Sequence, residues 1–226
     1  MDPNTRPTLD PSTDPSSGPR SGPNTGAVSG PDLPSVVIQV PTSATSLAAL
    51  TPHPGLDTFR PPRAQLASLV AIAQEPTGCV ATAILASEDQ LVGYAAFHRP
   101  SGIETWSDDR SGRLMELGAV EVAPGMRGLK LAERLLAAAF ADGRFDDTVV
   151  FATLYRWHYD LERTGLGELG YRRMLERLYA SVGLLPMPTN DIEVGSDHAN
   201  RLVARIGHAA PPEVVEEFQR LRLRRW

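Results

Sequence analysis

The chain of 226 residues carries a formal net charge of −5 at pH 7, and 42% of its residues are hydrophobic. This acidic balance argues against general nucleic-acid binding, and the apolar runs fall short of the roughly 18–20 residues that span a bilayer. With Cys79 as the single cysteine, a disulfide framework and a thiolate metal site are excluded. The histidines and acidic residues also lack metal-ligand spacing. We therefore expect a cytoplasmic protein without a metal, whose partners include neither nucleic acid nor a membrane.

Residues 1–34 differ in composition from the rest of the chain, because they are almost all Pro, Ser, Thr, Gly, Asp and Asn. Such a segment buries too little apolar surface to offset an ordering entropy of roughly 1–2 kcal/mol per residue. A signal peptide would need a basic segment followed by an apolar one, and this order is not found here. We expect residues 1–34 to form a disordered tail and residues 35–226 to form one domain.

The first half of this domain shows strand and helix patterns in turn. The β-branched run SVVIQV (35–40) predicts a strand. In LDTFRPPRAQLASLVAIA (56–73) two prolines suit the first turn of a helix, and apolar residues follow at helical spacing. Residues 77–86 and 91–99 are apolar runs joined by a short polar turn. They predict an antiparallel hairpin.

The second half predicts a strand–helix–strand unit followed by helices. Residues 113–123 and 148–154 read as strands, with an alanine- and leucine-rich helix over 127–142 between them. Such a unit implies a right-handed parallel crossover within a mixed sheet. Helices are then predicted over 170–183, over 197–207, where an aspartate begins the segment, and over 211–226, which begins with two prolines. The fold class is α/β, or α+β, with a mixed central sheet flanked by helices.

The turn between the strand and the helix of this unit contains Arg127 and Gly128. The first N–H groups of a helix have no internal partner and lie at the positive end of its dipole, so that they attract anions. The Walker A and dinucleotide-binding glycine patterns are both missing from this turn. The turn therefore predicts an anion site, of which phosphate is the commonest occupant.

The same turn resembles the pyrophosphate-binding signature Arg/Gln-x-x-Gly-x-Gly/Ala of the GNAT N-acetyltransferases. The signature maps onto Arg127, Gly128, Leu129, Lys130, Leu131 and Ala132, with Lys130 where the family keeps a glycine. The resemblance implies the GNAT acyl-CoA N-acyltransferase fold with extra C-terminal helices, and acetyl-CoA as co-substrate. It further implies that the strand before the turn splays from its neighbour and that its main chain, at Val120 and Val122, holds the thioester.

An amine must lose its proton before it attacks a thioester, so that a base is needed near the gap. Glu116 lies eleven residues before Arg127, the offset at which histone-acetylating members of the superfamily carry their base, and Glu121 is the second candidate. Strand alternation places the two carboxylates on opposite faces unless a bulge intervenes. Tyr155, which follows the next strand, is the candidate proton donor to the leaving thiolate, with His158 as an alternative. A surface ion pair for the acids and rim packing for the tyrosine remain open.

Four segments together resemble a narrower family, that of the acetoin-utilisation acetyltransferase AcuA: FRPPRAQLASLVAIA, LMELGAVEVAPGMRG, YRWHYDL and HANRLVARIG. This resemblance implies a protein-lysine acetyltransferase that inactivates acetyl-CoA synthetase, its protein partner, by direct attack of a lysine on the thioester. Residues 171–226 would provide the docking surface, and FRPPR and HANRLVARIG would line it or brace the core. The formation of homo-oligomers is left open.

Two alternatives remain at this point. The first is an acetyltransferase for a small amine, for which Glu104, Asp108 and Asp109 are the suggestive acidic cluster. The second is a protein that senses acetyl-CoA and inhibits the synthetase stoichiometrically with little turnover, an alternative that the departure at Lys130 keeps open.

Overall fold

A computed structural model describes residues 35–100, 102 and 105–224 of the chain. The tail predicted over residues 1–34 lies outside the described residues, and so does Glu104 of the acidic cluster. Both predictions on these residues stay untested.

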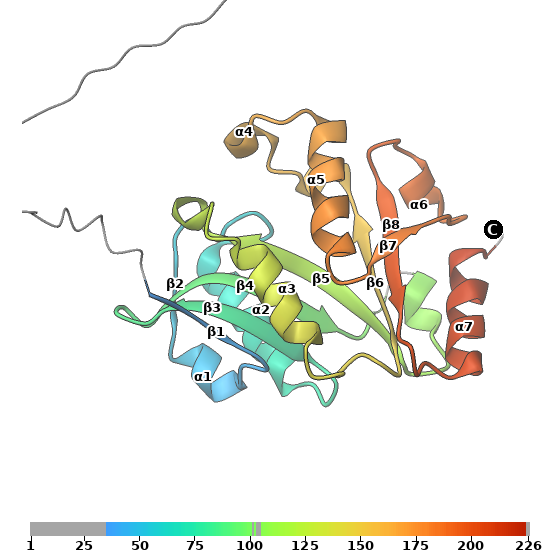
Figure 1. Cartoon of the computed structure of the whole chain (residues 1–226), viewed down its shortest axis with the longest axis horizontal. Coiled ribbons are helices and arrows are strands. Elements are labelled where there is room, and N and C mark those ends of the chain that lie inside the picture. Colours follow the sequence, from blue (N-terminus) through green and yellow to red (C-terminus); the bar gives the residue numbers. More distant parts are fainter. Residues whose placement is uncertain (1–34, 101, 103–104, 225–226) are drawn as a thin grey trace, which may run out of the picture. The chain divides into compact units, whose positions relative to one another are not determined.

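The described residues form a mixed sheet in which the strands follow the order β1-β3-β4-β5-β6-β8-β7, with β2 beside β4 (Figure 1). The pairs β5–β6 and β2–β4 are parallel, and the other pairs are antiparallel. The strands are β1 (Val36–Gln39), β2 (Thr51–Pro52), β3 (Cys79–Leu85), β4 (Gln90–His98), β5 (Leu114–Val122), β6 (Val149–Leu154), β7 (Leu185–Met187) and β8 (Arg201–Ile206). The predicted mixed sheet, with its hairpin and parallel crossover, is confirmed.

Helices cover both faces of this sheet; Figure 1 shows α3 and α5 on the near side and α2 on the far side. The helices are α1 (Ala44–Ala48), α2 (Pro62–Gln74), α3 (Leu131–Phe140), α4 (Leu161–Thr164), α5 (Glu168–Ala180), α6 (Ile192–Gly195) and α7 (Pro212–Arg222), with 3-10 turns at η1 (Thr105–Asp108), η2 (Pro124–Met126) and η3 (Arg156–His158). Proline at the first position of α2 and α7 begins both helices as predicted. Across the described residues, every helix is too short or too polar to cross a membrane.

Alternation along β6 divides the core between the two faces of the sheet. Val150 and Ala152 belong to the large apolar cluster that includes α3, whereas Val149 and Phe151 belong to a second cluster. In that second cluster the Trp106 ring of η1 lies 4.3 Å from the Phe151 ring, between centroids. The η1 turn and α7 therefore cover the face of β6 opposite to α3.

The prediction of a helix over residues 197–207 is wrong, because residues 201–206 of this segment form strand β8 between β6 and β7. Leu202, Val203 and Ala204 are all buried, since a central strand is covered on both faces, and such a continuous apolar run resembles a helical one in sequence. The Asp197 carboxylate accepts a hydrogen bond from the Ala199 N–H at 2.8 Å, which closes a local turn instead of capping a helix.

Strands β5 and β6 pair only at their beginnings and then separate. The paired residues are Leu114 with Val149, Met115 with Val150, and Glu116 with Phe151. Beyond this vertex β5 stays paired with β4 and β6 stays paired with β8, so that the two halves of the sheet diverge. This opening is the splayed gap that the GNAT resemblance implied.

Candidate active site

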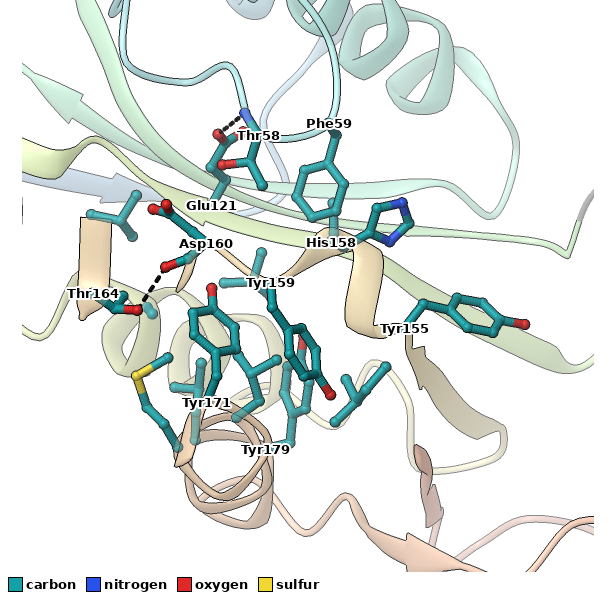
Figure 2. A pocket seen from close by; sticks show the side chains of 18 of the residues that line it. Thr58, Phe59, Glu121, Tyr155, His158, Tyr159, Asp160, Thr164, Tyr171 and Tyr179 are labelled. Atoms are coloured by element: carbon teal, nitrogen blue, oxygen red, sulfur yellow. Dashed lines mark hydrogen bonds between the residues drawn. The ribbon is translucent and has the colours of Figure 1, made fainter. Parts of the chain in front are cut away.

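A cleft of about 390 Å³ occupies the opening between β5 and β6. Its size lies within the range of small-molecule pockets, about 300–1,000 Å³. Figure 2 shows Thr58 and Glu121 on one side of the strand ribbon and Tyr171 and Tyr179 on the other, so that the cleft passes through the sheet. It is lined by Thr58 and Phe59, by Gly118, Ala119, Val120, Glu121 and Val122 of β5, by Arg127 and Ala132, by Thr153, Leu154, Tyr155, His158, Tyr159, Asp160 and Thr164, and by Tyr171, Met174, Leu175, Leu178 and Tyr179 of α5.

A β-bulge in β5 determines which way its acidic side chains point. Ala119 pairs with Ala96 and Leu117 pairs with Phe97, so that Gly118 is the extra residue. A Cβ atom on Gly118 would lie 2.3 Å from the Nε2 atom of His98, and only glycine fits there without displacing the ring.

The bulge places Glu116 and Glu121 on the same face of the sheet, because their β4 partners are His98 and Tyr94, four residues apart. The exception named in the sequence analysis therefore applies: the additional residue in the strand brings the two carboxylates to one face.

Glu121 is held in the cleft wall by two hydrogen bonds and is only 6% exposed. Its Oε1 accepts from the Thr58 N–H at 2.8 Å, and its Oε2 accepts from the Tyr94 hydroxyl at 2.6 Å. Burial, and next the charge of Glu121, raise the pKa of Tyr94, so that this hydroxyl remains protonated and donates. Each carboxylate oxygen can accept a further hydrogen bond, which leaves Glu121 able to take one from the cleft.

Glu116 lies at the vertex of the opening, where it pairs with His98 on one side and Phe151 on the other. It is half-buried, and the cleft wall does not include it. Of the two candidate bases, Glu121 is the one that contacts the cleft. The catalytic role of either carboxylate stays a prediction.

The edge of β5 that faces the opening carries main-chain groups of Val120 and Val122. The Ala123 N–H donates to the Val92 carbonyl of the neighbouring strand β4 at 2.9 Å, which indicates that the odd-numbered residues near the end of β5 form their hydrogen bonds with β4. Because bonded and non-bonded residues alternate in an antiparallel pair, Val120 and Val122 direct their N–H and C=O groups the other way. These are the two positions at which the sequence predicts main-chain contacts to a thioester.

The predicted phosphate turn has a backbone suited to an anion. Gly128 has a φ of +92° and Lys130 a φ of +52°, and α3 begins immediately afterwards. A left-handed conformation costs a non-glycine residue roughly 1–2 kcal/mol, which explains why the family keeps glycine where Lys130 stands. In the described chain the first turn of α3 has no side-chain cap. Its N–H groups therefore remain available to a ligand. Of the six motif residues, Arg127 and Ala132 line the cleft, Leu131 is buried in the core, and Gly128, Leu129 and Lys130 form the turn.

The Arg127 side chain ties this turn to α4. Its guanidinium pairs with Asp160 at 2.6 Å and donates to the Arg163 carbonyl at 3.0 Å. Arg163 in turn pairs with Asp57 at 2.8 Å. These two ion pairs connect α4 to both sides of the cleft, and a phosphate bound by Arg127 would replace the first of them.

The tyrosines divide between the rim and the wall of the cleft. Tyr155, the predicted proton donor, stacks on Trp157, and its hydroxyl donates to Glu193 at 3.3 Å, pointing away from Glu121 and Tyr179 in Figure 2. Tyr179 lines the cleft from α5, and burial raises its pKa. In the sequence Tyr179 lies on one side of the predicted helix 170–183 together with Met174, Leu175 and Leu178, and this side of the helix forms the cleft wall.

Two acidic groups outside the cleft have structural explanations. Asp108 pairs with Arg224, and Asp109 accepts from the Ser111 and Leu114 N–H groups, so that both organise their own loop and do not line the cleft.

The other group, Glu168, Asp197 and His198, brings its ligand atoms within 4.8 Å of one another. The Arg156 guanidinium already pairs with both carboxylates, at 2.8 and 2.9 Å, which accounts for their proximity.

Comparisons with known proteins agree with this geometry. The profile of the acetyltransferase (GNAT) family matches residues 48–155. The acetoin utilization protein AcuA of Bacillus licheniformis is 37% identical over 188 residues, covering 83% of this chain and 89% of that protein, and AcuA of Bacillus subtilis is 38% identical over 189 residues with the same coverage. The crystal structure of an acetoin utilization protein from Exiguobacterium sibiricum superposes with a TM-score of 0.79 at 37% identity, covering 83% of this chain and 89% of that one. The chain therefore belongs to the GNAT acetyltransferases and, among them, to the family of the acetoin utilization protein AcuA.

Proposed function

We propose that this acetyltransferase transfers the acetyl group of acetyl-CoA to a lysine of acetyl-CoA synthetase and thereby inactivates the synthetase. The observation that carries the proposal is the cleft through the sheet. The Glu121 carboxylate lies at one side of this cleft, and the first turn of α3 and the residues of α5 lie at the other. GNAT enzymes in general use acetyl-CoA, and the AcuA resemblance supplies the protein substrate. We place the reaction in the cytoplasm, where acetyl-CoA and the synthetase meet.

The donor enters from the side of α3 and α5. The N–H groups of the first turn of α3, with Lys130 beside them, bind the pyrophosphate. The main-chain groups of Val120 and Val122 hold the thioester arm in the opening.

The acceptor enters from the opposite side, past Thr58 and Glu121. The lysine ammonium passes a proton to Glu121, directly or through one water, because only the free amine is nucleophilic. The amine nitrogen attacks the thioester carbonyl carbon, the new C–N bond forms and the C–S bond breaks; CoA leaves as the thiolate, and the nitrogen releases its second proton to water as it becomes the amide. The Tyr179 hydroxyl, which its raised pKa keeps protonated, donates a hydrogen bond to the leaving sulfur.

The test combines the purified protein, acetyl-CoA and the synthetase of the same organism, and it measures lysine acetylation by mass spectrometry together with synthetase activity. We expect one acetylated lysine and a parallel loss of activity. Inhibition without acetylation would replace the proposal with a stoichiometric regulator. Acetyl-CoA binding without either effect would replace it with a small-amine acetyltransferase.

A further inference from the structure

An aromatic ledge, made of Tyr155, Trp157 and His158, lies at the rim of the cleft. The Tyr155 and Trp157 rings are stacked, with centroids 4.3 Å apart and planes at 11°. Trp157 is nevertheless 57% exposed, whereas Tyr155 and His158 line the cleft. An indole that is stacked on one face and still more than half exposed is a preformed contact surface, because its position is fixed before a partner arrives.

The ledge lies on the side of the cleft where the acceptor enters. The His158 ring contacts the Phe59 ring edge to face, with centroids 5.2 Å apart. Phe59 follows Thr58, whose N–H binds the Glu121 carboxylate. A chain segment that delivers a lysine amine to Glu121 would therefore pass beside this ledge.

The charges around the ledge favour a cation. Glu193 on α6 is exposed, accepts a hydrogen bond from Tyr155, and forms no ion pair within the described part of the chain. The charge of Arg156, the cation next to Trp157 in sequence, is matched by Glu168 and Asp197. Partial burial lowers the pKa of His158, so that its ring is neutral at pH 7 and adds no positive charge.

We propose that the aromatic ledge and Glu193 bind an arginine or lysine side chain that lies next to the target lysine in the acceptor protein. This inference rests on the proposed protein-lysine acetyltransferase function. The faces of Trp and Tyr attract cations, and a carboxylate beside them adds directional pairing for a guanidinium. A small amine held inside the cleft would not reach the exposed Trp157 ring, so that the ledge distinguishes a protein acceptor from a small one.

The experiment measures acetylation kinetics of the synthetase with the full chain and its variants. Trp157→Ala should lower kcat/KM for the synthetase about tenfold, which corresponds to about 1.4 kcal/mol, through KM and with kcat and the KM for acetyl-CoA unchanged. Trp157→Phe should recover most of the loss, since it retains a ring. Glu193→Gln should lower kcat/KM by a few fold, and Glu193→Lys by more, because it repels the cation.

Leu185→Ala is the matched control, because Leu185 on β7 is likewise exposed (52%) and does not line the cleft. If Trp157→Ala acetylates the synthetase as fast as Leu185→Ala, or if Glu193→Lys behaves like Glu193→Gln, the cation site is refuted while the lysine acetyltransferase function stands. If the wild-type protein acetylates no lysine of the synthetase, the proposed function is refuted, and the proposed cation site, which rests on it, is refuted as well.

Discussion

Replacing Glu121 by glutamine separates its proposed role as a base from its role as an anchor. The substitution keeps the size of the side chain but removes the charge and replaces one acceptor oxygen by an amide donor. Either the Thr58 N–H or the Tyr94 hydroxyl then loses its acceptor in a site that is 6% exposed. The lost hydrogen bond to a charged group should lower the free energy of unfolding by about 1.5–3 kcal/mol. Loss of a general base should lower kcat about 10²–10⁴-fold.

The assay follows CoA thiol release at saturating acetyl-CoA and acceptor, with stability measured separately by denaturant unfolding. Glu116→Gln is the matched control, because it removes a carboxylate from the same face of the same strand without touching the cleft wall. Tyr94→Phe isolates the anchor, since it removes one hydrogen bond from Glu121 and should lower stability with little change in kcat. If Glu116→Gln lowers kcat a hundredfold while Glu121→Gln stays within threefold of wild type, the assignment of Glu121 as base is refuted and Glu116 takes that role.

Three further changes test other parts of the structure. Tyr179→Phe should lower kcat about 10²-fold with acetyl-CoA affinity preserved in a direct binding measurement; an unchanged kcat would exclude the hydroxyl from the reaction. Gly118→Ala should lower the free energy of unfolding by about 1–3 kcal/mol, because the new methyl group meets the His98 ring, and the loss should shrink when His98→Ala is added; equal losses in both backgrounds would contradict the steric cause. A hydrogen bond from Arg220 lowers the pKa of Glu217 to about 2, below its ordinary value of 4.5, so that this interaction stabilises the fold above about pH 4.5 and loses that effect as the pH falls toward 2. Glu217→Gln should therefore cost about 1–2 kcal/mol at pH 7, and unfolding curves of the two proteins should converge near pH 2.

The order of the main elements follows from sequence patterns that are local. The two prolines that begin α2 and the apolar stripe of α3 are signals within a few turns of chain, and both helices form where those signals predict. Strand β8 was predicted as a helix, because its burial on both faces depends on pairing with β6 and β7, and local patterns do not reveal that pairing. A central strand without alternation looks like a helix until its neighbours are known.

The site was harder to predict than the fold, and the reason lies in Gly118. The GNAT resemblance points to Arg127, Gly128, Val120 and Val122 within one continuous strand and turn, and of these Arg127, Val120 and Val122 line the cleft. Which carboxylate reaches the cleft depends instead on a bulge, and a single glycine in a strand is compatible with a bulge without establishing one. Tyr179 was missed for a related reason: an apolar helix stripe that lines an opening has the same pattern as one that packs in a core.

The chemistry of the cleft wall favours direct transfer between acetyl-CoA and the amine. A covalent acetyl-enzyme would need an activated nucleophile in the opening, and the thiolate is the side chain best suited to that step. Cys79, the single cysteine of the chain, lies in β3, is 2% exposed and does not line the cleft. Burial raises the pKa of its thiol, so that it is protonated at neutral pH. Because the cleft opens on both sides of the sheet, a donor and an acceptor bound as proposed above, with the amine at Glu121 and the phosphates at the α3 turn, would meet there at the same time. Direct transfer needs no covalent acetyl-enzyme. The acetyl group therefore does not have to be transferred to the protein before the acceptor binds.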